Sequence, residues 1–335
     1  MRVGLVYKNF AAWAGISHIG LGVAAEMDAR YLNAHGVEAK VIPVRNNVDI
    51  VDRLRAEKFT HIVISAPWLS AFDLDAIVKA FPNVEFVICI HSNIGFLQAD
   101  PGAISLMRRY IAVSQERANF HLAGNCRPFV QWLEEVYNIE AFLLPNLYPF
   151  DRKEMRSAWN PDDVLRIGTF GAIRPQKNVL TAAAAALLLS RRLGVPVEFN
   201  ISTGREDGGA SVILQAIREM SRHTPGFHLC ERSWSDWHDF KRVLRGMNLL
   251  IQVSYTESFN IVTADGISEG VPSVVSEAIA WAPKHWRANP DSVQDVAYVA
   301  ERLLGNAAER HQGIVALYEH NQTAFKFWEK YLTKS

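Results

Sequence analysis

The sequence predicts an α/β protein built from two Rossmann-like domains that face each other across a cleft. Short apolar runs rich in β-branched residues alternate with longer helical patterns, which is typical of parallel sheets with crossover helices. The alternation stops at a Pro-rich stretch, Pro145–Phe150, and then starts again. A chain of 335 residues is long enough to bury two cores of ordinary size.

The pattern assigns each element in turn. In the first half we expect strands at Val3–Tyr7, Ala39–Val44, Thr60–Ala66, Val84–His91, Tyr110–Ser114 and Ala141–Leu143. In the second half we expect strands at Arg166–Phe170, Val197–Ser202, Phe227–Cys230, Leu249–Val253 and Ser273–Val275. The clearest helical patterns are Gly22–His35, Val179–Leu193, Asp236–Gly246 and Ala307–Leu332. The expected domains are residues 1–150 and 151–306, and residues 307–335 form a helix that packs back on the first domain.

Composition narrows the functional classes. The chain carries 35 basic and 35 acidic residues, which argues mildly against a nucleic-acid-binding domain. Its three cysteines show no CxxC spacing, so we expect reduced thiols and not a disulfide or zinc framework. No apolar stretch is long enough for a transmembrane segment, and no signal peptide precedes the first strand. We therefore expect a cytoplasmic protein; the composition leaves its oligomeric state open.

The most informative stretch is Leu249–Val275, LLIQVSYTESFNIVTADGISEGVPSVV. A buried strand ends there at a short loop that carries Glu257, and a helix begins near Asn260. The amides of Asn260, Ile261 and Val262 would then lie at a positive helix end, which suits a phosphate. Asp265 lies one turn further along the same face, where a carboxylate can accept hydrogen bonds from a ribose diol. An ordinary strand–loop–helix unit with two solvated acids is the alternative.

The run ESFNIVTADGISEGVPSVV resembles the E-x7-E segment of retaining GT-B glycosyltransferases, glycosyltransferase family 4 in particular. Glu257 matches the first Glu, Ser258-Phe259-Asn260 match the turn that follows, and Gly270 and Pro272 match a Gly-x-Pro. Asp265 stands where the second Glu is usual, and Gly266 stands where Ala is usual. Glu269 falls on a variable position of the pattern.

Other segments resemble the same family in the same order. One such segment is IGTFGAIRPQKN, which resembles the segment whose two cations hold the donor diphosphate. Lys177 matches the Lys of that segment. The usual position of its Arg is occupied by Ala172, and Arg174 lies two residues later. YIAVSQERANFHL resembles the family's AVS strand and helix. His91 resembles a histidine that contacts the donor sugar, with a structural histidine as the alternative. Gly15 lies in a loop that corresponds to the glycine-rich first loop of these enzymes, and Arg205 in a loop expected over the nucleotide.

Further candidates lie in the first domain. Trp13 and Trp68 follow the first and third predicted strands and could stack on an acceptor, although packing is the more common use of Trp. His18 is a weaker candidate for the acceptor side. Asp73-Leu74-Asp75 spells a DxD, but it opens a predicted helix and suits first-turn acids. We expect no metal and no cofactor.

The resemblance implies a metal-independent retaining glycosyltransferase whose donor is a UDP- or GDP-sugar. Glu257, His91, Lys177 and Arg174 would be its catalytic residues. The acceptor, whether carbohydrate, lipid, small molecule or modified DNA, is left open. The alternatives are a DNA-modifying glycosyltransferase that acts on a hydroxymethylated base, a nucleotide-sugar epimerase, and a catalytically inactive subunit that binds a sugar nucleotide.

Overall fold

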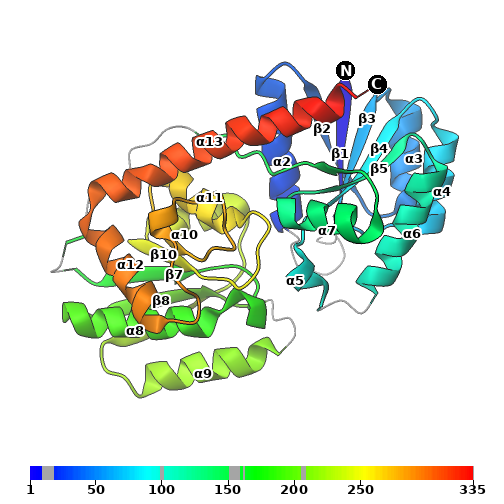
Figure 1. The fold of residues 1–335 in the computed structure, drawn as a ribbon. Helices are drawn as coiled ribbons and strands as arrows, with labels where there is room; N and C mark the ends of the chain where they lie inside the picture. Colours follow the sequence, from blue (N-terminus) through cyan, green and yellow to red (C-terminus); the bar gives the residue numbers. More distant parts are fainter. Residues whose placement is uncertain (10–18, 99–101, 151–158, 161–162, 205–208, 335) are drawn as a thin grey trace. The chain divides into compact units, whose positions relative to one another are not determined.

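The protein is described here by a computed structural model covering residues 1–9, 19–98, 102–150, 159–160, 163–204 and 209–334. The chain divides into two compact units, Met1–Pro149 with Asn321–Ser335, and Phe150–His320. Each unit is built around one parallel sheet (Figure 1). The predicted fold class, an α/β protein with two Rossmann-like parallel sheets, is therefore confirmed.

The sheet of the first unit has six described strands in the order β2-β1-β3-β4-β5-β6. Their bounds are β1 (Arg2–Lys8), β2 (Glu38–Val44), β3 (His61–Ser65), β4 (Glu85–Ile90), β5 (Phe120–Gly124) and β6 (Ala141–Leu143). The helices between them are α2 (Ile19–Ala34), α3 (Asn47–Ala56), α4 (Ala71–Ala80), α5 (Ile94–Leu97), α6 (Ala103–Glu116) and α7 (Arg127–Tyr137). Because all strands run in parallel, their carboxyl ends meet at one edge.

Helices cover both faces of this sheet (Figure 1). On one face, residues of α3, α4, α6 and α7 pack against alternate strand residues such as Val6 and Ile64. On the other face lie α2 and the end of α13 (Ala307–Leu332), whose Trp328 and Tyr331 are buried beside Leu5. The apolar face of the final helix therefore packs, through its last turns, into the core of the first unit.

The second unit holds five described strands in the order β11-β10-β7-β8-β9. Their bounds are β7 (Leu165–Thr169), β8 (Val197–Ser202), β9 (Phe227–Arg232), β10 (Leu249–Gln252) and β11 (Ser273–Val275). Around them lie η1 (Pro175–Lys177), α8 (Val179–Leu193), α9 (Ala210–Arg222), α10 (Trp237–Arg245), α11 (Ile261–Ser268), η2 (Lys284–Trp286) and α12 (Val293–Gly305). The inner strands β10 and β7 direct their carboxyl ends toward the loops that the sequence singled out.

One predicted strand is wrong. Tyr110–Ser114 belongs to helix α6, and the strand of this region is β5, ten residues later. The buried residues Ala103, Met107 and Tyr110 recur at helical spacing, and a four-residue apolar run cannot by itself distinguish a helix from a strand. Ser114 therefore does not lie at the strand edge of the sheet, and its hydroxyl donates to the Ile111 carbonyl of its own helix.

Two general expectations can be compared with the described residues. Cys89, Cys126 and Cys230 are free thiols, and the first two are buried. Within the described part of the chain, every helix is too short or too polar to cross a bilayer.

Candidate functional site

The loop that carries Glu257 joins β10 to α11 at the carboxyl edge of the second sheet. The N-cap residue of α11 is Asn260, whose backbone is left-handed with φ 62°, a conformation that Asn adopts more readily than most residues. Its side-chain oxygen accepts a hydrogen bond from the Thr263 amide at 2.9 Å. The helix therefore begins at Ile261, as predicted, and its first amides lie at this edge.

Glu257 is the centre of a hydrogen-bonded network in this loop. Only 6% of the residue is exposed, and its Oε1 accepts from Ser254 Oγ at 2.8 Å and from Asn260 Nδ2 at 2.9 Å. The Lys177 ammonium donates to the same oxygen at 2.5 Å. A buried carboxylate needs such partners, because an unpaired charge away from water is costly. The network holds Glu257 in one position.

Lys177 reaches Glu257 because backbone contacts join two segments far apart in the sequence. The Tyr255 amide donates to the Gln176 carbonyl at 2.9 Å, next to Lys177 in η1. Asn178, also left-handed at φ 55°, donates through Nδ2 to the Val253 carbonyl at 3.2 Å. The loop after β7 and the loop after β10 are thereby fastened together.

The remaining predicted donor-side residues lie around this network. Arg174 is the half-buried N-cap residue of η1. Ser258, Ile261 and Val262 are half-buried at the start of α11. Phe259 is buried and stacks on Trp281, with ring centroids 5.2 Å apart, and the Trp281 indole N–H donates to the Phe259 carbonyl.

Asp265 is buried and paired with a residue of the neighbouring helix. It is 2% exposed, and its Oδ1 accepts from the Trp237 indole N–H at 2.9 Å. One turn later, Glu269 is also buried and pairs with Lys241 Nζ at 2.8 Å and with Arg245. The two acids of α11 thus contact different side chains of α10, and neither is a solvated surface charge.

The structure also explains a departure from the family pattern. A Cβ added to Gly266 would lie 2.6 Å from Leu250 Cδ1 and 3.2 Å from the Val271 carbonyl oxygen. The usual Ala therefore fits only if Leu250 moves, since α11 packs directly on the inner strand β10.

The first unit brings a different set of polar side chains to the carboxyl edge of its sheet. His91 directly follows β4, and burial lowers its pKa to about 4, so that the ring is neutral at pH 7. Asn125, which directly follows β5, donates to Asn146 Oδ1 at 2.7 Å and lies 3.5 Å from His91 Nδ1. Sequence reasoning missed Asn125 because it misplaced the strand; the signal was the apolar run Phe120–Gly124.

Of the predicted acceptor residues, the structure describes only Trp68. Trp68 is half-buried, packs against the core of the first unit, and has the Lys8 ammonium 5.5 Å from its ring centroid. Packing is thus the use of Trp68 that these contacts support. Trp13, Gly15, His18 and Arg205 lie outside the described residues.

The DxD segment is part of a helix start. Ser70 caps α4 by accepting from the Asp73 amide, so that Asp73 lies in the first turn. Asp75 pairs with Arg117 at 2.6 Å. The described residues contain no group of three His, Cys, Asp or Glu side chains arranged to hold a metal ion.

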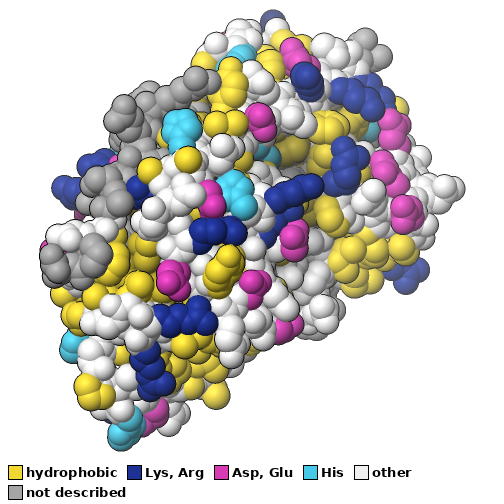
Figure 2. Space-filling model, turned by 60° about the vertical axis from the view of Figure 1, so that its left-hand side comes forward, with side chains coloured by type: hydrophobic (Ala, Val, Ile, Leu, Met, Phe, Trp, Pro, Cys, Tyr) yellow, Lys and Arg dark blue, Asp and Glu magenta, His cyan; other side chains and the backbone are white. Residues whose placement is uncertain are grey.

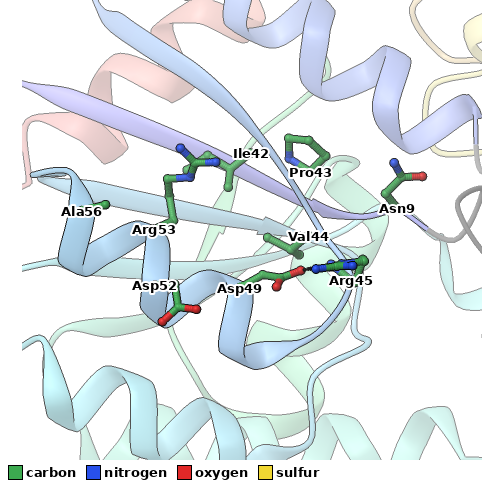
Figure 3. Close-up of a pocket in the computed structure, with 9 residues that line it drawn as sticks. All are labelled: Asn9, Ile42, Pro43, Val44, Arg45, Asp49, Asp52, Arg53 and Ala56. Atoms are coloured by element: carbon green, nitrogen blue, oxygen red, sulfur yellow. Dashed lines mark hydrogen bonds and ion pairs between the residues drawn. The ribbon is translucent and has the colours of Figure 1, made fainter.

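A separate hollow of about 540 Å³ lies along β2 and α3 (Figure 3). It is lined by Asn9, Ile42, Pro43, Val44, Arg45, Asp49, Asp52, Arg53 and Ala56. Its charges are balanced, and Arg45 is already engaged by Asp49, whose Oδ2 lies 3.4 Å from Arg45 Nε. None of the predicted site residues that the structure describes lines it.

Comparison with known proteins identifies the fold. By sequence, the chain matches no family model and no curated protein. By structure, it resembles a UDP-forming trehalose-phosphate synthase from Burkholderia xenovorans in complex with glucose 6-phosphate, with a TM-score of 0.68, 12% identity and 99% of both chains covered. It also resembles a sucrose-phosphate synthase from Thermosynechococcus elongatus, with a TM-score of 0.67, 13% identity, and 99% of this chain and 98% of that chain covered.

A third similar structure is an S. aureus TarM variant in complex with UDP, with a TM-score of 0.61 and 14% identity. The match covers 82% of this chain but 55% of TarM, so the chain spans about half the length of that protein. At these identities the likeness is one of fold. The chain therefore has the GT-B type of α/β fold, with two parallel sheets.

Proposed function

We propose that the protein is a glycosyltransferase that moves a sugar from a nucleotide-diphosphate sugar to an acceptor hydroxyl. The observation that carries the proposal is the buried Glu257, paired with Lys177 at the beginning of α11. A carboxylate, an ammonium and a helix N-terminus together offer an acceptor for a sugar hydroxyl and donors for a diphosphate. The resemblance to glycosyltransferase family 4 rests on the same residues.

The diphosphate would be held by Lys177 and by the amides of Ile261 and Val262. An ammonium has three N–H donors, so Lys177 can keep its bond to Glu257 while it donates to a phosphate oxygen. Arg174, three residues earlier, would supply a second cation. Glu257 would accept a hydrogen bond from a hydroxyl of the donor sugar and so orient its anomeric carbon.

We further propose a retaining reaction that needs no resident metal ion. The bond between the anomeric carbon and the diphosphate oxygen breaks, and the acceptor oxygen bonds to that carbon from the same face. The acceptor proton passes to the departing phosphate oxygen. Donors fixed before the reaction, here Lys177, Arg174 and the helix amides, stabilise the negative charge that develops on the leaving group.

The nucleotides associated with the similar proteins suggest the order in which donors should be tried. The B. xenovorans enzyme is described as UDP-forming, and TarM was solved with UDP, so UDP-sugars come first and GDP-sugars second. On the face drawn in Figure 2, Lys and Arg side chains are interspersed with Asp and Glu side chains. The chain as a whole carries 35 basic and 35 acidic residues, and this balance favours a carbohydrate, lipid or small-molecule acceptor over DNA, which binds extended basic surfaces. A cytoplasmic location stays a prediction of the sequence.

A donor screen tests the proposal. Thermal unfolding is measured with UDP-, GDP- and ADP-sugars, because a ligand that binds the folded state raises the melting temperature. The sugar nucleotide that stabilises the protein is then incubated with it, and release of the nucleoside diphosphate is followed. Stabilisation with release supports the proposal. Stabilisation without release under any acceptor tried would indicate an inactive sugar-nucleotide-binding subunit, and no stabilisation by any donor would contradict the proposal.

A further inference from the structure

We propose that Trp237 is a positioning residue of the donor site, whose indole N–H orients the Asp265 carboxylate toward the nucleotide. The inference rests on the proposed function, because it assigns Asp265 to the ribose of the donor. It adds a residue of α10 to the second unit's part of the site, whose other candidate residues among those described come from the loops after β7 and β10 and from α11.

The orientation of the Asp265 carboxylate determines which of its oxygen atoms can contact a ligand. The Trp237 indole N–H donates to Asp265 Oδ1 at 2.9 Å, and only 2% of Asp265 is exposed. An indole N–H can only donate, so this bond sets which side of the carboxylate faces the ring. A ligand would have to meet Asp265 on a side that the indole does not cover.

Trp237 is itself held firmly enough to orient a partner. It is the first residue of α10, and the N-cap residue Asp236 accepts from the Asp239 amide at 2.9 Å, which defines how the helix begins. One turn later, the Lys241 ammonium lies 4.8 Å from the centroid of the Trp237 ring. The indole is thus fixed by the helix start on one side and by a cation on the other.

The two helices are matched along their length. On α10, Trp237, Lys241 and Arg245 are spaced by four residues and so share one face. Asp265 on α11 and Glu269, the C-cap residue of that helix, are likewise four residues apart. Trp237 pairs with Asp265, and Lys241 and Arg245 pair with Glu269. The Glu269 pairs fasten the end of α11 to α10, and the Trp237 bond acts directly on the Asp265 carboxylate.

This arrangement suits the shorter acid. The family pattern has Glu at position 265, and Asp ends one methylene earlier. A longer side chain at this position would have to displace the indole or point elsewhere. We therefore regard Trp237 and Asp265 as a matched pair, in which the indole N–H holds the shorter carboxylate in one orientation.

The test compares Trp237→Phe, which removes the N–H and keeps most of the ring, with Trp286→Phe. The Trp286 indole N–H also donates at 2.9 Å, but to the Glu309 carbonyl in the buried part of the same unit. Both changes delete one indole hydrogen bond, and both can lower stability. Steady-state kinetics with the best donor of the screen are measured for each variant, for Asp265→Asn and for the double variant Trp237→Phe/Asp265→Asn.

We expect Trp237→Phe to raise KM for the donor about tenfold, as loss of a hydrogen bond to a charged group typically does, and to leave most of kcat. Trp286→Phe should leave KM unchanged. The double variant should match Asp265→Asn, because both single changes act through one carboxylate. A KM for Trp237→Phe within twofold of wild type, or effects that multiply in the double variant, would overturn the inference alone. A wild-type protein that binds and turns over no sugar nucleotide would overturn it together with the proposed function.

Discussion

Each unit of this protein buries a carboxylate next to a connecting segment, and the two carboxylates have opposite surroundings. In the second unit, Glu257 accepts from the Lys177 ammonium and two neutral donors. In the first unit, Asp28 on α2 is 5% exposed and accepts from the Leu147 amide at 2.7 Å. Burial outweighs that bond and raises the pKa of Asp28 to about 8, so the group is mostly neutral at pH 7.

The difference separates the acid that we propose for chemistry, Glu257, from Asp28, whose contacts are structural. Asp28 helps to hold the last stretch of the first unit. The Tyr148 amide next to Leu147 donates to Asn321, and the Trp328 indole N–H donates to the Pro145 carbonyl. A neutral carboxyl group is sufficient to accept the hydrogen bond from the Leu147 amide. Glu257 instead lies beside a cation at the start of a helix, where a charged ligand can be bound. Burial alone therefore does not identify a site acid; the partners do.

The largest expected effect follows from exchanging these two acids for their amides. Glu257→Gln removes the charge that pairs with Lys177, and we expect transfer to fall by about a hundredfold or more, as loss of a positioned polar group in an active site often does. Asp28→Asn should leave turnover of the donor unchanged. Initial rates with the stabilising donor measure both. Wild-type turnover by Glu257→Gln, with the fold intact by circular dichroism, would show that the E-x7-E interpretation is wrong.

The second-largest expected effect concerns the two cations of the proposed diphosphate site, Lys177 and Arg174. Lys177→Ala should weaken binding of the nucleoside diphosphate about tenfold or more and leave binding of the nucleoside nearly unchanged, because a charge-assisted contact to phosphate is lost. Arg174→Ala should act in the same direction with a smaller effect. Isothermal titration with both ligands gives the comparison.

Arg192→Ala serves as the control for charge alone. Arg192 lies near the far end of α8, on the surface, where its guanidinium is 3.8 Å from Glu301 of α12, so the variant should bind like wild type. Equal losses for diphosphate and nucleoside in Lys177→Ala would place Lys177 outside the phosphate site.

Asp28 should make stability depend on pH with a definite sign. Its folded pKa of about 8 lies above that of an unfolded Asp, so the folded state retains a proton that the unfolded state releases. The contribution of Asp28 to the free energy of unfolding is fully present below about pH 4. It is lost as the pH rises toward about 8, and the free energy of unfolding falls by up to about 1.4 kcal/mol per pH unit.

Denaturant unfolding across this pH range measures the effect, with Asp28→Asn as the comparison. The amide oxygen of Asn can still accept from the Leu147 amide, but it does not titrate. We expect the unfolding free energy of the variant to decline less steeply with pH. An identical pH dependence in wild type and variant would mean that Asp28 is ionised in the folded protein.

The smallest expected effect concerns how closely α11 lies on its sheet. Gly266→Ala restores the family residue but brings Cβ within 2.6 Å of Leu250 Cδ1, so we expect a loss of about 1 kcal/mol from overpacking. Leu250→Val in the same chain should recover part of the loss. In the first unit, a Cβ added to Gly20 in α2 meets no atom of the described residues within 4 Å, so Gly20→Ala should be neutral or slightly stabilising. Chemical unfolding of the four proteins decides whether the contact is as tight as the structure has it.

Much of this protein is determined by local sequence pattern. The predicted bounds of Val197–Ser202, Val179–Leu193 and Ala307–Leu332 agree with those of the structure, because side-chain periodicity and capping residues are properties of neighbouring positions. The position of Glu257 in the loop before α11 is likewise a matter of a few consecutive residues. The one misplaced strand, Tyr110–Ser114, is a short apolar run, in which that periodicity is ambiguous.

Partners distant in the chain were decided only by the tertiary structure. Lys177 meets Glu257 across 80 positions, and Trp237 meets Asp265 across 28. The raised pKa of Asp28 likewise depends on how deeply α2 is buried in the first unit. No local pattern records such pairs, because a hydrogen bond or a desolvation cost depends on which surfaces packing brings together, and packing is a property of the whole sheet and its helices.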